Sequence, residues 1–320
     1  KTRPTPAKVV TDEIEIPKEI TDNIEEVNLF MDLMFVNNTV GLTARDSKIK
    51  ARHYAIVKSK SRPDLYKALD QITRRYNRID TQIRTIHCDQ EFRPIMNPVF
   101  DEMNTTMNYT TTGEHQPHAE RNNRYLKERV RTKFQRMPFR EVPKIITRRV
   151  CQHTTERTNW YPPKGGISSH FSPHKILEQR DINWEHECAA EIGSFVHAWG
   201  HDTNNSQKCR VIEGIYLGPT KGLQEGHEIL NLQTGKPVTR RKIQEFPMTR
   251  QVINIVEDMA AAEGVRHFHT YTKNPEGQLI IDADLLAEVG EDIFDEDYTE
   301  ENTENRSDNN LRNESFPKKK

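Results

Sequence analysis

The feature that most constrains this chain is an acidic residue inside an apolar strand. Residues 28–36, NLFMDLMFV, have the composition of a buried β-strand, and Asp32 lies at its centre. An ionised carboxylate in such surroundings is costly unless a cation or a hydrogen-bond donor offsets its charge. Asp32 therefore indicates either a cation-binding site or an edge carboxylate that is bonded to a neighbouring amide.

The order of the expected elements predicts the class of fold. Strands are expected over 39–44, 53–57, 81–87 and 106–111, and helices over 63–76, 98–103 and 117–137. Together with 28–36, the chain gives three strands, a helix, a strand, a helix, a strand and a long helix. This order favours an α/β core with a mixed, partly antiparallel sheet over a doubly wound fold.

The pattern of expected elements changes after the Pro-Pro-Lys-Gly-Gly run at 162–166. Short strands alternate with turn residues over 195–200, 211–218, 227–232 and 237–246, which is typical of a small β-barrel. The expected organisation is a linker over 1–22, the α/β core over 23–190, a small SH3-like barrel over 191–250, and a linker with an acidic disordered tail over 251–320, in which 251–264 is helix-like.

Charge is distributed unevenly, although the net charge is only −1. Residues 119–149 carry eleven Lys and Arg against three Glu, whereas residues 274–305 carry twelve Asp and Glu and no Lys or Arg. A basic segment suits a phosphate backbone, and an acidic segment with few apolar residues cannot offset the entropy of folding. We find no apolar run long enough for a membrane span and no signal peptide, so we expect a soluble, intracellular protein.

The four cysteines are scattered without a CxxC pair, which argues against a disulfide scaffold or a zinc ribbon. Zinc binding by Cys188, His197, His201 and Cys209 is not expected, because the two cysteines lack partners at the usual spacing.

Two further carboxylates could complete a site around Asp32. Asp89 follows the strand 81–87, and Glu120 lies in the first turn of the long helix. Three carboxylates on separate elements could hold two divalent cations for phosphoryl transfer. Each also has an ordinary explanation: Asp89 could end a strand in an Asx-turn, and Glu120 could complement the helix dipole.

Local strings around these residues resemble one known family. FMDLMFVN, IHCDQEF and EHQPHAERNNRYLKER resemble, in this order, the catalytic motifs of integrases from copia-type retrotransposons. WYPPKGGISSHFSPHKIL, YLGPTKG and NLQTGKPVTRRKIQEFPM resemble the region that follows the catalytic core in the same polyproteins. The likeness extends from about residue 28 to about residue 248. The sequence after Asp89, Gln-Glu-Phe, differs from the Asn-Gly-Gly-Glu-Phe that is frequent in this family.

The resemblance implies an RNase-H-like core with Asp32, Asp89 and Glu120 as catalytic and metal-binding residues and two Mg²⁺ or Mn²⁺ ions. The implied activity is that of a polynucleotidyl transferase, which joins the 3′ ends of element DNA to target DNA. It also implies a homo-oligomer, a reverse transcriptase in the same polyprotein, no membrane partner, and a nuclear location with cytoplasmic passage. Glu114 and Glu128 are rival third ligands.

Basic residues near these motifs are the expected DNA contacts. Arg124, Lys127 and Arg131 follow Glu120 on one helix face. The full set of expected DNA-binding residues is Arg121, Arg124, Lys127, Arg131, Arg240, Arg241 and Lys242. The alternative for the basic residues is a solvated helix face. The alternatives for the function are a catalytically inactive nucleic-acid-binding remnant of such an element and a hydrolytic nuclease of the RNase-H-like fold. We expect the chain to be a fragment of a polyprotein or of a decayed element.

Overall fold

The computed structural model describes residues 13–110, 116–199, 210–221 and 225–265, and the backbone of 272–273 and 279–280. The chain divides into two compact units, Lys1–Arg266 and His267–Lys320. The second unit contains the short antiparallel strands β11 (Thr272–Lys273) and β12 (Leu279–Ile280). Most of the acidic tail that the sequence predicts to be disordered lies outside the described residues. Within the described ranges, no helix has the length and apolar character that a membrane span requires.

The larger sheet has five strands in the order β3-β2-β1-β4-β5. Its strands are β1 (Glu26–Val36), β2 (Thr39–Asp46), β3 (Arg52–Val57), β4 (Gln82–Cys88) and β5 (Thr106–Tyr109). β2 is antiparallel to both of its neighbours, β1 and β3, whereas β4 is parallel to both β1 and β5. The mixed sheet expected from the sequence is confirmed, and with its flanking helices it fits the RNase-H-like architecture.

Side chains alternate between the two faces of this sheet, as strand geometry requires. On β1, Leu29, Met31 and Leu33 are buried in the main hydrophobic core. Phe30 and Asp32 occupy the intervening positions and are only partly buried. The two faces of the sheet therefore have different roles: one anchors the core, and the other carries Asp32.

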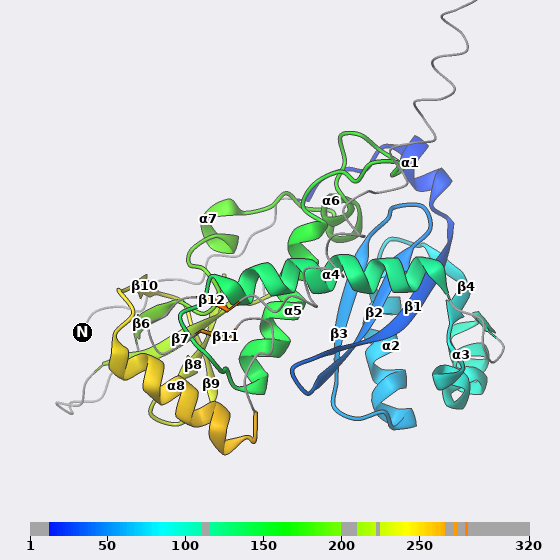
Figure 1. The fold of residues 1–320 in the computed structure, drawn as a ribbon. Coiled ribbons are helices and arrows are strands. Elements are labelled where there is room, and N and C mark those ends of the chain that lie inside the picture. Colours follow the sequence, from blue (N-terminus) through cyan, green and yellow to red (C-terminus); the bar gives the residue numbers. More distant parts are fainter. Residues whose placement is uncertain are drawn as a thin grey trace, which may run out of the picture. The chain divides into compact units, whose positions relative to one another are not determined.

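Helices cover both faces. The core face packs against α2 (Arg62–Asn77), the 3₁₀ helix η1 (Gln90–Ile95) and α3 (Met96–Met103), whose buried residues belong to the same core. The Asp32 face contacts α4 (Pro117–Gln135) and α5 (Lys144–Thr158). Figure 1 shows α4 running across the strands rather than along them. The short helices are α1 (Lys18–Asn23), α6 (Pro173–Glu178) and α7 (Trp184–Glu187).

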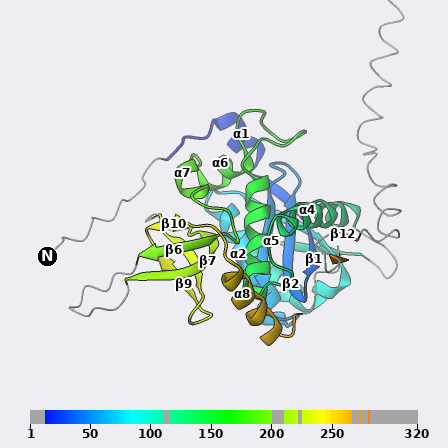
Figure 2. The ribbon, with the colours of Figure 1, turned by 60° about the vertical axis from the view of Figure 1, so that its left-hand side comes forward.

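Helix α5 is absent from the sequence-based expectation. Its sequence, KIITRRVCQHTTERT, is rich in β-branched residues, which are weak helix formers. Several of its buried positions are polar, such as Thr147, His153 and Thr155, so the apolar pattern does not reveal the buried face. Figure 2 shows α5 between the larger and the smaller sheet.

The smaller sheet has the order β10-β6-β7-β8-β9, with antiparallel neighbours throughout. Its strands are β6 (Phe195–Trp199), β7 (Val211–Pro219), β8 (His227–Asn231), β9 (Pro237–Arg240) and β10 (Ile243–Glu245). The single strand expected over 237–246 is wrong. The chain bends at Arg241 and Lys242, so that β9 and β10 lie at opposite edges of the sheet. Because these edge strands follow each other directly, the sheet must curve at this corner; an SH3-like barrel remains a prediction.

Two segments assigned to linkers belong to the folded body. Ile16 and Ile20, within the expected linker 1–22, are buried in the main core. Helix α8 (Arg250–Ala262), within the expected linker after residue 250, buries Val252 and Val256. Each segment has too few apolar residues for their spacing to indicate tertiary packing. The assignment of both segments to linkers is therefore corrected.

A contact from the end of α8 supports the start of α5. The Lys144 backbone N–H, at the first position of α5, donates to Glu263 Oε2 at 2.7 Å. The first N–H groups of a helix lack partners within the helix, and an acidic side chain there also complements the helix dipole.

We predict that Glu263→Ala lowers the free energy of unfolding by roughly 0.5–2 kcal/mol, the range for loss of a helix cap. Chemical denaturation measures this value. Asp258→Ala is the matched control, because Asp258 is an exposed acid on the same helix. Equal losses in the two variants would show that the Glu263 contact contributes nothing specific.

Candidate active site

Asp32, within β1, and Asp89, directly after β4, lie at corresponding positions of two neighbouring parallel strands. The register pairs Phe30 of β1 with His87 of β4. Asp32 and Asp89 each lie two residues further along, and the backbone of Asp89 remains extended at φ −80° and ψ 167°. Phe30 and His87 stack with ring centroids 5.1 Å apart on the face opposite the main core. By alternation, both aspartates belong to this same face.

The carboxylate of Asp32 is held by two hydrogen bonds. The Leu33 backbone N–H donates to Oδ1 at 2.6 Å. Asn123 on α4 donates from Nδ2 to Oδ2 at 2.6 Å, and the Asn123 amide oxygen accepts from the Thr43 hydroxyl at 2.5 Å. Thr43 is the cross-strand partner of Asp32 on β2. Asn123 therefore bridges two strands and fixes the orientation of the carboxylate.

Burial and two neighbouring carboxylates disfavour the ionised form of Asp32. Burial raises the pKa of Asp32 from 3.8 to about 6, and the nearby Asp89 and Glu91 also raise it, against the hydrogen bonds from Leu33 and Asn123. A raised pKa means that the ionised form is disfavoured relative to water. A cation beside Asp32 and Asp89 would relieve this cost.

Glu120 lies in the first turn of α4, over the same face of the sheet. Two contacts place this turn: the His118 ring lies 4.6 Å from the Phe30 ring, and Asn123 bonds Asp32. Glu120 is one helical turn before Asn123 and is exposed. The first turn of α4 therefore carries Glu120 near the rim of the Asp32 and Asp89 pair.

The carboxylate oxygens of Asp32 and Asp89 are the ligands that Mg²⁺ and Mn²⁺ prefer. Within the described residues, however, no group of three or more His, Cys, Asp or Glu is arranged to hold a metal ion. The structure thus brings together Asp32 and Asp89 but does not gather Glu120 with them into a three-ligand site. Of the rival third ligands, Glu114 lies outside the described residues, and Glu128 pairs with Arg131 at 2.7 Å.

Sequence reasoning missed Glu91 and Asn123. Glu91 acts on Asp32 electrostatically and forms an ion pair with Lys60 at 3.0 Å. Helical periodicity could have indicated Asn123, because it follows Glu120 by three residues and so shares its side of the helix. Glu91 offered a weaker signal, since it follows Asp89 by two residues in a segment with no clear strand or helix pattern.

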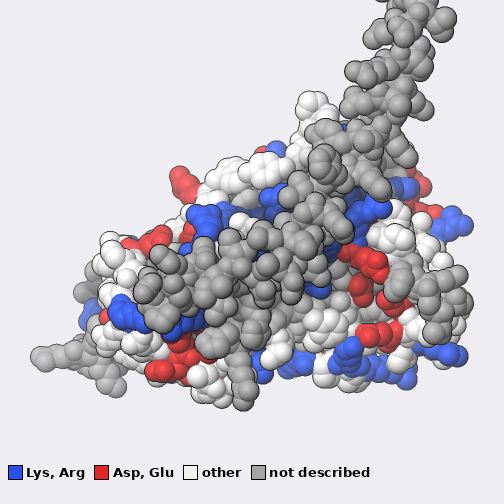
Figure 3. Space-filling model, viewed as in Figure 1, with Lys and Arg blue, Asp and Glu red and all other residues white. Residues whose placement is uncertain are grey.

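The basic residues expected on α4 form an exposed row. Arg121, Arg124 and Lys127 are exposed, and Arg131 is partly buried and paired with Glu128. Lys and Arg side chains gather along the band that α4 occupies in this view, with acidic side chains to the right of the same face (Figure 3). A phosphate backbone could lie along this row with its reacting group near the acidic pair.

The other expected DNA contacts lie in the smaller sheet, around the bend between β9 and β10. Arg240 ends β9 and donates to the Thr239 carbonyl at 2.8 Å. Lys242 lies beyond the bend, with Nζ 5.2 Å from the centre of the Trp199 ring. The sequence predicts one strand that carries Arg240, Arg241 and Lys242, and this prediction is wrong. The three residues lie at the corner between β9 and β10.

The zinc set considered from the sequence is only partly described. His201 and Cys209 lie outside the described residues. The ring of His197 stacks on that of Phe246 at 4.1 Å, and the exposed Cys188 accepts from Arg157 Nη2 at 3.5 Å.

Comparison with known proteins finds similarity among solved structures but not among family models or curated proteins. No family model matches the chain, and no curated protein matches it. Among solved structures, the catalytic core domain of BIV integrase is similar, with a TM-score of 0.35 and 14% sequence identity over 48% of this chain and 93% of that chain.

The Asn123 bridge makes a testable prediction about Asp32. Replacing Asn123 by Ala removes a hydrogen bond to the ionised carboxylate, so the pKa of Asp32 should rise by about one pH unit. Carboxyl ¹³C chemical shifts measured against pH report this value.

Asn122→Ala is the matched control. Asn122 is equally buried on the same helix, but its amide oxygen accepts from Arg52 Nε at 3.1 Å rather than contacting Asp32. A pKa of Asp32 that does not differ between the two variants would contradict the assigned role of Asn123.

Proposed function

We propose that this chain is an integrase-like polynucleotidyl transferase that joins the 3′ ends of element DNA to a target duplex, of the copia type that its motifs resemble. One observation carries the proposal: Asp32 in β1 and Asp89 directly after β4 lie at corresponding positions of adjacent parallel strands, beneath the helix that bears Glu120. Paired carboxylates at a sheet edge suit metal-assisted phosphoryl transfer.

In this proposal the residues have distinct roles. Asp32 and Asp89 would hold the cations, and Glu120 would supply the third carboxylate. Asn123 keeps Asp32 in one orientation through its bond to Thr43. Bound Mg²⁺ or Mn²⁺ would stabilise the charge that develops on the attacking and leaving oxygens. The protein itself contributes positioning and charge rather than covalent chemistry.

The basic row on α4 would hold the DNA backbone beside this site. Arg121, Arg124 and Lys127 are exposed along the same helix. Since phosphate contacts fix register without reading sequence, these residues would position the DNA ends rather than select them. Arg241 and Lys242, at the corner of the smaller sheet, would add further backbone contacts.

A catalytically inactive DNA-binding protein is the second candidate. It is favoured by the absence, among the described residues, of a three-ligand acidic group. Such a protein keeps the basic row but lacks a complete metal site. A hydrolytic nuclease is the third candidate, and only the reaction product distinguishes it from a strand-transfer enzyme.

If the chain is a strand-transfer enzyme, joined DNA products should form in the presence of Mg²⁺ or Mn²⁺. Each of three substitutions should abolish these products: Asp32→Asn, Asp89→Asn and Glu120→Gln. A gel assay that separates cleaved from joined products measures this. Glu128→Gln is the control and should retain activity, because Glu128 is occupied by Arg131. DNA binding without any product would favour the inactive candidate, and cleavage without joining the nuclease.

Affinity for DNA should depend on the exposed row. Replacing Arg124 and Lys127 together by Ala should weaken binding and reduce the slope of log affinity against log salt by about two, because each phosphate contact contributes about 0.9. Titrations at several salt concentrations measure the slope. Arg84→Ala is the control, since Arg84 already pairs with Glu26 at 3.2 Å. An unchanged slope in the double variant would mean that this face does not contact DNA.

A further inference from the structure

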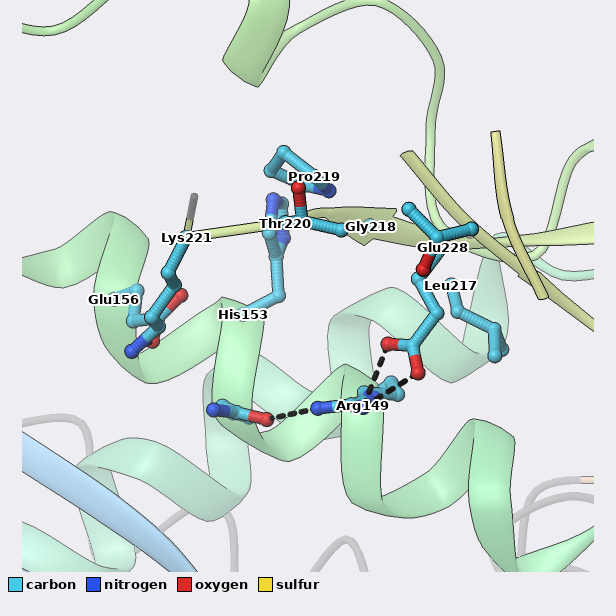
Figure 4. A pocket seen from close by; sticks show the side chains of 11 residues that line it. Arg149, His153, Glu156, Leu217, Gly218, Pro219, Thr220, Lys221 and Glu228 are labelled. Carbon is cyan, nitrogen blue, oxygen red and sulfur yellow. Dashed lines mark hydrogen bonds and ion pairs between the residues drawn. The ribbon is translucent and has the colours of Figure 1, made fainter. Parts of the chain in front are cut away.

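A polar pocket lies where α5 meets the smaller sheet, apart from the Asp32 site (Figure 4). Its volume is about 260 Å³. One face of α5 supplies Arg149, Gln152, His153 and Glu156, which recur at helical spacing. The end of β7, with residues of β8 and β9, supplies the opposing wall.

Two ion pairs define the opposite ends of the pocket. Arg149 Nη2 contacts Glu228 Oε2 at 2.6 Å, and Arg149 Nη1 donates to the Gln152 side-chain oxygen at 2.8 Å. At the other end, Lys221 pairs with Glu156. The pocket therefore contains two cations and two anions, and it offers no net attraction to a charged ligand.

The backbone of β7 is shaped to pass close to α5. A β-bulge lies between Tyr216 and Gly218, and Gly218 has a φ of +127°, a conformation that L side chains rarely adopt. A Cβ at Gly218 would lie 3.9 Å from the His153 ring. The strand therefore passes next to His153 of α5 at Gly218.

His153 lies between the two ion pairs, and one of its ring nitrogens has no hydrogen-bond partner among the described residues. This nitrogen, Nε2, is buried. Burial lowers the pKa of His153 to about 4, so the ring is neutral at pH 7. A buried polar group without a partner costs free energy, which a suitably placed ligand would recover.

We propose that this pocket binds a small, neutral, hydroxyl-rich ligand, of the class of a sugar ring that carries a vicinal diol. Each hydroxyl both donates and accepts, so it can donate to a free lone pair of Glu156 or Glu228 and accept from the Gln152 amide. An anionic ligand would gain no net attraction, because the two cations of the pocket are already paired with carboxylates. The volume suits a ligand smaller than a typical drug molecule. A free sugar and the ribose of a nucleoside share this chemistry.

Saturation-transfer NMR with ribose, adenosine and adenosine 5′-monophosphate tests the proposal. Ribose and adenosine should bind saturably, and tighter binding of adenosine would identify a nucleoside. Gln152→Ala should weaken this binding about three- to tenfold, the value of one hydrogen bond. Gln135→Ala, an exposed glutamine on α4, is the matched control and should have no effect.

A second variant fills the pocket without changing α5. Thr239 lines it from the edge strand β9, where its side chain is exposed, so Thr239→Phe should fold and abolish the binding. Three results would overturn the proposal: no saturable binding of either neutral probe, binding that neither pocket variant weakens, or a pocket-dependent affinity for the monophosphate that equals or exceeds that for adenosine.

Discussion

The hydrogen bond from Asn123 to Asp32 links the two halves of the candidate site. It joins α4 to β1, and the second bond of Asn123, from the Thr43 hydroxyl, joins the same helix to β2. A partly buried carboxylate must be held by donors or charges, and here one donor comes from a long helix that also bears the basic row. The position of α4 over the sheet therefore depends on Asp32, the same residue whose charge would bind a cation.

The strand order explains why the acidic pair forms. β1 is central, with antiparallel β2 on one side and parallel β4 on the other. Parallel neighbours run in the same direction, so Asp32 within β1 lies beside Asp89, the first residue after β4. The core side of β1 and β4 supplies the packing that holds this pair, through Met31 and Cys88, which are fully buried. The core residues and the candidate metal-binding carboxylates therefore lie on opposite faces of the same two strands.

Periodic segments were predictable from the sequence, and segments shaped by tertiary contacts were not. The alternation in β1 and the apolar spacing of α2 indicated both elements correctly. Helix α5 buries threonine and histidine against two sheets, so its sequence carries no clear apolar stripe. The bend at Arg241 separates two strands that read as one, because the chain there passes between opposite edges of a curved sheet. For the site, the position of Asp32 was evident from a single strand, whereas Asn123 and Glu91 depend on how separate elements meet.

Anomalous diffraction from crystals soaked in Mn²⁺ tests whether Asp32 and Asp89 form a metal site. A manganese peak is expected between the two carboxylates, within the roughly 2.0–2.6 Å at which oxygen ligands bind such cations. Asn123→Ala crystals should keep the peak with reduced occupancy, because the carboxylate of Asp32 loses its fixed orientation. A peak elsewhere on the chain, or none at Asp32 and Asp89 under conditions that saturate a control metalloprotein, would contradict the assignment of this face as the active site.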